Sequence, residues 1–390
     1  QIFVATSSVG PGSTNMVTAA AVALSNRLPI LLLPGDTFAN RFPDPVLQQV
    51  ENFYSPTTTQ NDSFRAVSKY FDRITRPEQI LTSLPQAVQM MLDQADCGPA
   101  TLSISQDVQG EAFDYPEIFF EEKIHEIRRI YPDQNQLKKA ADVIKNSQQP
   151  IIISGGGVLY SEAEKELSDF AKKHNIPVMP TAMGIGCMDK DDPYYIGPIG
   201  CLGVGSSNSL SKDTDLALAI GTKLGDFTTG SWSNFHNPDF KLVSINAARF
   251  DVTKHRATPV ISDAKVGLKE LTKKLDDWKA PANWYERARK EAKEWDQYVA
   301  KASGPTNQEL PTYAHAVGAV YRNADSSDVV VTAAGGLVGE VVQIWKPKQI
   351  NTFETEWGFS CMGYEISGAL GIKMAKPDQD VVVFVGDGSY

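Results

Sequence analysis

The chain has 390 residues, enough for two or three domains with buried cores. Hydrophobic residues make up 42% and charged residues 22%, which is ordinary globular usage and excludes disordered and fibrous classes. A net charge of −10 without a Lys/Arg cluster argues against nucleic-acid binding, and the longest apolar runs fall far below the ~20 residues of a membrane span.

Short β-branched or Leu-rich runs alternate with amphipathic segments along the chain, which predicts parallel α/β layers. The pattern divides into three blocks. For the first block, residues 1–118, it predicts strands Ile2–Thr6, Ile30–Pro34 and Ala100–Ser105 and helices Thr14–Ser25 and Gln79–Gln94.

The second block, residues 132–280, has the pattern of a Rossmann-like layer. Ser161 to Glu164 form a capping-box pattern that predicts the start of a helix ending near His174. A charged helix at Ala282–Ala302, within a linker at 281–308, is expected to have a solvated face. The other predicted elements are helix Gln134–Lys145 and strands Pro150–Ser154, Ile176–Thr181, Leu216–Gly221 and Lys241–Asn246.

The third block, residues 309–390, repeats the plan of strand, glycine turn and helix. It is predicted to contain helices Tyr313–Val320 and Met362–Ala375, a helix ending near Trp345, and strands Asp328–Thr332, Asn351–Glu354 and Asp380–Val385. Because the sequence begins and ends within strand patterns, we expect the first and third blocks to be truncated.

The cysteines are well separated in the sequence. Cys97, Cys187, Cys201 and Cys361 form no CxxC pair. This spacing favours reduced thiols in a cytoplasmic protein over a disulfide framework, and it argues against a zinc site.

A Gly-Pro-Gly turn at residues 10–12 lies between a predicted strand and helix. Glycines there allow close backbone approach, and the first turn of the helix offers free N–H groups. A purely structural turn explains this motif equally well. Neither this turn nor Gly155-Gly156-Gly157 matches the GxGxxG dinucleotide pattern.

Gly386-Asp387-Gly388 follows a buried-strand pattern. A carboxylate at the carboxyl end of a parallel strand suits Mg²⁺, which prefers oxygen ligands and often shares them with a phosphate. The alternative is a turn aspartate that caps the next helix.

Several motifs occur together in a recognisable order. Residues 10–15, Met183-Gly184-Ile185-Gly186, Leu216–Phe227, Trp357–Glu365 and residues 386–388 follow one another along the chain. In this order they resemble the thiamine-diphosphate-dependent enzymes of the acetolactate synthase type, over essentially the whole chain. The resemblance implies a three-domain α/β architecture.

The resemblance also implies thiamine diphosphate and Mg²⁺ as cofactors. Asp387 would hold the metal, Met362 would support the bent cofactor, and the Ser360 carbonyl would accept a hydrogen bond from its aminopyrimidine. The turn at 333–338 lacks the Gln-His of the synthases, so only its backbone is expected to contact the diphosphate. The implied cofactor-binding residues are Gly10, Gly12, Asn15, Gly335, Gly336, Leu337, Gly358, Ser360, Met362, Gly386, Gly388 and Ser389.

No catalytic residue is assigned within this chain. The family's activating glutamate is expected upstream of Gln1, and an Asn completing the metal site is expected beyond Tyr390. The chain alone is therefore expected to be inactive. In the family the cofactor lies between two subunits, which implies a homodimer or homotetramer. Glu356 is open to a structural or a functional interpretation.

The segments Phe353–Ser367 and Lys223–Trp232 most resemble a branch of the family that hydrolyses a C–C bond of a cyclic 1,2-dione in myo-inositol breakdown. One alternative is a carboligase acting on 2-keto acids, with FAD as a further cofactor in the central block. Another is a non-catalytic binding module, although the intact residues 386–388 argue against it.

Overall fold

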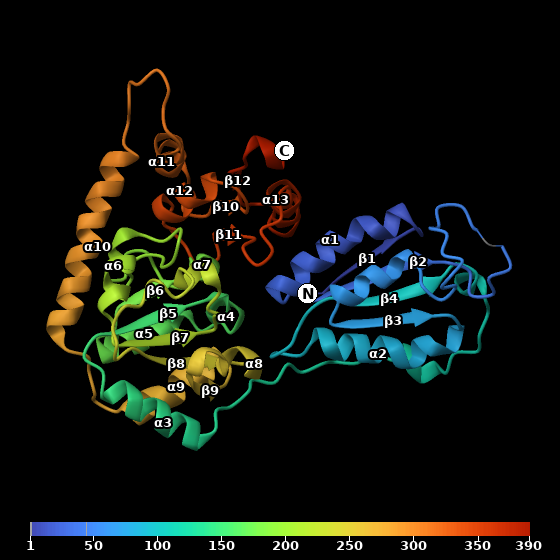
Figure 1. The fold of residues 1–390 in the computed structure, drawn as a ribbon, viewed down its shortest axis with the longest axis horizontal. Coiled ribbons are helices and arrows are strands. Elements are labelled where there is room, and N and C mark those ends of the chain that lie inside the picture. The colour runs from blue at the N-terminus through green and yellow to red at the C-terminus, as the bar shows by residue number, and fades with distance from the viewer. Residues whose placement is uncertain (1, 44) are drawn as a thin grey trace. The chain divides into compact units, whose positions relative to one another are not determined.

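The computed structural model describes residues 2–43 and 45–390. The chain separates into two compact units, Gln1–Arg128 and Arg129–Tyr390. Each unit alternates strands with helices, and every strand pairing is parallel (Figure 1). The parallel α/β fold class predicted from the sequence is therefore confirmed.

The first unit contains a sheet with the strand order β1-β2-β4-β3. Helix α2 packs against one side of this sheet, around Leu102, and helix α1 contributes Ala20 to a cluster with Leu32 and Phe64. The elements are β1 (Phe3–Ser7), α1 (Pro11–Asn26), β2 (Ile30–Asp36), β3 (Tyr70–Ile74), α2 (Ile80–Met91) and β4 (Ala100–Ser105).

The second unit contains a sheet with the order β6-β5-β7-β8-β9. Its strands are β5 (Pro150–Ser154), β6 (Val178–Pro180), β7 (Leu216–Ile220), β8 (Lys241–Asn246) and β9 (Thr258–Ile261). Its helices are α3 (Gln134–Lys145), α4 (Gly156–Tyr160), α5 (Glu164–His174), α6 (Gly205–Asp213), α7 (Asp226–Thr229), α8 (Arg249–Val252), α9 (Ala264–Leu275) and α10 (Ala282–Ala302).

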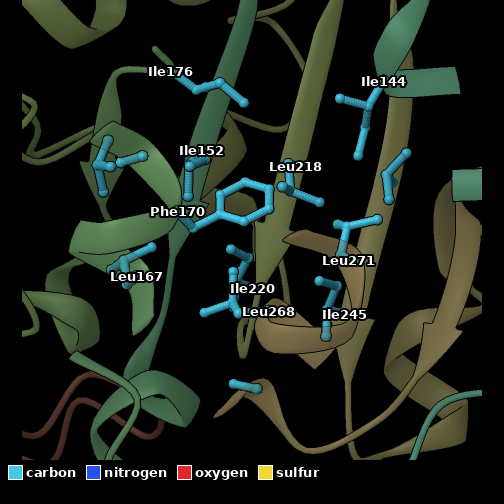
Figure 2. Packing of buried hydrophobic residues seen from close by; sticks show 14 of the residues in the cluster. Ile144, Ile152, Leu167, Phe170, Ile176, Leu218, Ile220, Ile245, Leu268 and Leu271 are labelled. Atoms are coloured by element: carbon cyan, nitrogen blue, oxygen red, sulfur yellow. The ribbon is translucent and has the colours of Figure 1, made fainter. Parts of the chain in front are cut away.

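Successive side chains of this sheet enter two separate cores, as expected of a sheet covered on both faces. Ile152 and Leu218 pack with residues of α3, α5 and α9, and the Phe170 ring lies in the middle of this cluster (Figure 2). On the opposite face, Ile151 and Ile153 pack with residues of α6 and α10. The charged helix α10 thus has a buried apolar side in addition to its solvated face.

The same unit contains a third sheet with the order β11-β10-β12. Its core joins Val330 to residues of α11, α12 and the strand β11, and Ile185 of the preceding segment packs into it. The elements are α11 (Tyr313–Asn323), β10 (Val329–Thr332), α12 (Leu337–Ile344), β11 (Phe353–Thr355), α13 (Tyr364–Ala375) and β12 (Val381–Val383).

Three local predictions are wrong. Ser161 does not open a capping box, because it ends the short helix α4, and α5 begins at Glu164 after Ala163 without a side-chain cap. The pattern of strand Pro150–Ser154 followed by Gly155-Gly156-Gly157 predicts a turn there, but α4 begins at Gly156. Met362 lies just before α13 rather than inside it. Within residues 2–43 and 45–390, no helix combines the length and the apolar character that crossing a membrane requires.

Candidate functional site

The three strands of the β11-β10-β12 sheet run parallel, so their carboxyl ends lie at one edge. The segments that leave this edge are the turn 333–336 after β10, the loop 356–363 after β11 and residues 384–389 after β12. All predicted cofactor-binding residues of the third block fall on these segments or on the first residue of α12. Edges of this kind are where open α/β sheets bind ligands.

The turn after β10 exposes its backbone. Gly335 has φ 88° and precedes α12, which begins at Leu337. A Cβ atom added to Gly335 or Gly336 would meet no described atom within 4 Å, so the space beside both residues is open. Free N–H groups at a helix start, next to open space, suit a phosphate group. The turn therefore fits a diphosphate without a side-chain contact.

The loop after β11 and the segment after β12 lie side by side. A Cβ on Gly388 would be 3.0 Å from the Met362 Cε atom, and one on Gly363 would be 3.5 Å from the Ser389 carbonyl oxygen. Met362 is 59% exposed, so its side chain is accessible to a ligand at this edge. Ser360, with φ 55°, is also exposed. The structure thus brings Met362, Gly388 and Ser389 together.

Glu356 holds the loop from within. Its carboxylate is 2% exposed; Oε1 accepts a hydrogen bond from the Phe359 N–H and Oε2 one from the Cys361 N–H, each at 2.7 Å. Of the two interpretations left open by the sequence, these contacts support the structural one.

Glu365 is a residue that sequence reasoning missed. It is fully buried in the first turn of α13, and its Oε1 accepts a hydrogen bond from the Ala334 N–H at 3.0 Å. Its Oε2 accepts one from the Gly363 N–H at 3.1 Å. The available signal was a charged residue among the small and apolar residues that follow Met362. One carboxylate therefore joins the turn after β10 to the end of the loop after β11.

Asp387 begins the single-turn helix Asp387–Ser389 and is exposed. In the described part of the chain, no three His, Cys, Asp or Glu side chains cluster closely enough to enclose a metal ion. Mg²⁺ commonly takes only one or two carboxylates and completes its shell with water and substrate phosphates. Asp387 follows β12 at the same edge of the sheet as the open turn, which fits that mode of binding.

A neighbouring glutamate on β11 behaves differently. Burial raises the pKa of Glu354 to about 7, while the Lys376 charge and a hydrogen bond with Tyr364 act in the opposite direction. In the folded protein, Glu354 therefore keeps its proton to a higher pH than an exposed glutamate does. Its partners lie at the two ends of α13: Tyr364 is the first residue of the helix and Lys376 follows its last residue.

The motif segment Leu216–Phe227 of the central block also reaches this edge of the sheet. The rings of Phe227 in α7 and Trp357 lie 5.3 Å apart in an edge-to-face arrangement. Together with Leu202 and Val342 they line a small crevice between the two sheets of the second unit. Trp357 begins the loop that carries Ser360 and Met362, so the central layer contacts the candidate site directly.

Residues 137–271 match the family described as "Thiamine pyrophosphate enzyme, central domain", and residues 333–390 match "Thiamine pyrophosphate enzyme, C-terminal TPP binding domain". The whole chain is 41% identical to a 3D-(3,5/4)-trihydroxycyclohexane-1,2-dione hydrolase of Clostridium tetani, covering 64% of that protein. Two segments of the chain therefore match thiamine pyrophosphate enzyme domains.

Proteins with the same name in Geobacillus thermodenitrificans and Clostridium perfringens are each 40% identical across the whole chain, which covers 64% and 65% of their lengths. The chain thus spans about two thirds of these curated relatives. The resemblance to this family, predicted from the order of the motifs, is confirmed. The individual roles of the site residues and the boundaries at 118, 132, 281 and 309 stay predictions.

The remaining predicted residues lie in the first unit. Gly10 has φ 72° and precedes α1, and a Cβ there would be 1.8 Å from the Gln48 carbonyl oxygen. Gly12 lies against the Ser8 hydroxyl, and Asn15 is exposed on α1. Close packing inside the unit therefore explains why residue 10 is glycine, whatever ligand the turn binds.

The buried carboxylate of Asp36 in the first unit has a structural role. Asp36 ends β2 and is completely buried, and the Arg73 Nε donates to its Oδ2 atom at 2.7 Å. The Ser103 hydroxyl donates to the same oxygen at 2.6 Å, and the Thr37 N–H donates to Oδ1 at 2.8 Å. Because its oxygens are already hydrogen-bonded, we assign Asp36 to holding the carboxyl edge of this sheet.

Proposed function

We propose that the full-length protein is a thiamine-diphosphate-dependent hydrolase that opens the ring of 3D-(3,5/4)-trihydroxycyclohexane-1,2-dione to 5-deoxyglucuronate in myo-inositol breakdown. The observation that carries this proposal is the 41% identity, across the whole chain, to a protein of that name. The proposal applies to the whole protein in the cytoplasm, because the chain spans only part of its relatives.

Each part of the carboxyl edge has a role in the proposal. The N–H groups of Gly335, Gly336 and Leu337 hold the diphosphate, and Asp387 binds the Mg²⁺ that neutralises it. Met362 would support the bound cofactor. When bound, thiamine diphosphate supplies the nucleophilic carbon and the electron sink that cleavage next to a carbonyl requires.

The overall reaction consumes one water. The C–C bond between a carbonyl carbon and its neighbour breaks, hydroxide becomes part of the new carboxylate, and a proton goes to the other carbon. A neutral polyhydroxylated ring needs hydrogen-bond donors and acceptors rather than an Arg clamp.

The function is tested by incubating the purified full-length protein with the cyclic dione and following the products by NMR. The proposal predicts 5-deoxyglucuronate only when both thiamine diphosphate and Mg²⁺ are present. Formation of acetolactate from pyruvate, with the dione left intact, would instead establish the carboligase alternative.

The role of Met362 predicts a specific loss. Met362→Ala in the full-length protein is expected to lower kcat by about tenfold or more, because the cofactor loses its apolar support, while the melting temperature changes little at this 59% exposed side chain. Steady-state kinetics and thermal melts check this. Parallel losses of activity and stability would indicate that Met362 is only packing.

The assembly follows from the same proposal. We infer a homodimer or homotetramer in which the first unit of one subunit completes the site on the second unit of another, as the family resemblance implies. Light scattering of the full-length protein with Mg²⁺ and thiamine diphosphate should give at least a dimer. A catalytically active monomer would contradict a shared site.

A further inference from the structure

The loop between β11 and α13 has a backbone that needs to be held in place. Ser360 has φ 55° and Gly363 φ 91°, and a positive φ is costly for a residue that carries a Cβ. Such conformations persist where surrounding contacts determine them. Here the contacts are the buried carboxylates of Glu356 and Glu365.

The two carboxylates act over different distances. Glu356 accepts hydrogen bonds from the Phe359 and Cys361 N–H groups, which both lie in the loop itself. Glu365 accepts one bond from Gly363 at the end of the loop and one from Ala334, which is 31 residues away. Ala334 immediately precedes the open turn at Gly335 and Gly336.

From this geometry we propose that Glu365 is a positioning residue: it fixes the turn at 334–336 and the loop at 358–363 in one relative arrangement, so that a ligand's diphosphate and the group resting on Met362 are received together. This inference rests on the proposed function, because it takes thiamine diphosphate as the ligand. Prior ordering of the two segments reduces the entropy lost on binding.

The chemistry of the carboxylate makes the proposal testable by an isosteric change. An ionised glutamate offers two acceptor oxygens, whereas glutamine offers one oxygen and one NH₂ donor. Glu365→Gln therefore keeps the shape but leaves either the Ala334 or the Gly363 N–H facing another donor. Leaving a buried N–H donor without an acceptor costs about 1–3 kcal/mol of free energy. If that cost falls on the arrangement that binds the ligand, the affinity drops by about tenfold.

The experiment compares two ligands in the full-length protein with Mg²⁺. Inorganic diphosphate probes the turn alone, and thiamine diphosphate probes the turn and the loop together. Calorimetry should show that Glu365→Gln weakens thiamine diphosphate by about tenfold or more. The variant should weaken the binding of inorganic diphosphate less. The ratio of the two affinities, which favours thiamine diphosphate in the wild type, should therefore fall.

Glu356→Gln is the matched internal variant, since it weakens hydrogen bonds from the loop's own Phe359 and Cys361 N–H groups. It should weaken thiamine diphosphate while leaving the affinity for inorganic diphosphate unchanged. Glu294→Gln, on the exposed side of α10, should change neither affinity. If Glu365→Gln binds both ligands as the wild type does, the inference is overturned. A wild-type protein that binds no thiamine diphosphate would overturn the proposed function as well.

A second measurement does not depend on a folded variant. Hydrogen exchange of the wild-type protein without cofactor should show slow exchange at the Ala334 and Gly363 amides, because both are bonded to one buried carboxylate. Rapid exchange at both amides, with protection appearing only after cofactor binds, would show that the arrangement is not fixed beforehand.

Discussion

Asp387→Ala in the full-length protein is expected to abolish Mg²⁺-dependent binding of thiamine diphosphate, with a loss of affinity of about 100-fold or more. Even indirect partners of a bound metal change its affinity by about 10–100-fold, and Asp387 is the carboxylate proposed to contact the ion directly. The side chain is exposed, so the fold should remain intact. Calorimetry with and without Mg²⁺ measures the effect.

Asp378→Ala provides the control for this variant. Asp378 is also exposed and precedes the same strand, β12, but it lies at the opposite end of that strand from Asp387. It should bind cofactor like the wild type. Equal cofactor affinity in the Asp387→Ala protein would remove the aspartate from the metal site and leave it as a turn residue.

Phe170→Ala is expected to destabilise the central layer by about 3–5 kcal/mol, because it removes a large side chain from a densely packed core. Phe170 is 1% exposed and lies among Ile152, Leu218 and Leu271 (Figure 2). Its ring also lies 4.7 Å from the buried His174 ring. The free energy of unfolding, measured in denaturant, tests the expectation.

Phe250→Ala is the corresponding surface variant. Phe250 is 77% exposed on α8 and its ring centroid lies 5.0 Å from the Lys254 Nζ atom, so its replacement should change the free energy of unfolding by about 1 kcal/mol at most. A similar small change at Phe170 would mean that this core can close around the missing ring.

The central strands could be predicted from the sequence because their signal is strong. Leu216–Ile220 is buried along its whole length, so every residue is apolar and the strand is apparent without knowledge of its neighbours. Two other strands were missed for a physical reason. β3 and β9 lie at the ends of their described sheets, and they contain charged residues or a proline, as edge strands commonly do.

The candidate site also has parts that the sequence predicts and parts that it does not. The position of Asp387 after a strand could be predicted, because a glycine-flanked carboxylate following an apolar run is a local pattern. The bond from Ala334 to Glu365 could not, since it joins residues 31 apart through a turn and a helix start whose relative placement depends on the folded sheet. The same holds for the approach of Met362 to Gly388.

The most direct test of the account is a structure of the full-length protein with Mg²⁺ and thiamine diphosphate. The account predicts the diphosphate beside Gly335 and Gly336, an Asp387 oxygen about 2.0–2.1 Å from the Mg²⁺ ion, and Met362 against the cofactor. A cofactor bound away from the carboxyl ends of β10 and β12, or a metal ion that Asp387 does not contact, would contradict it.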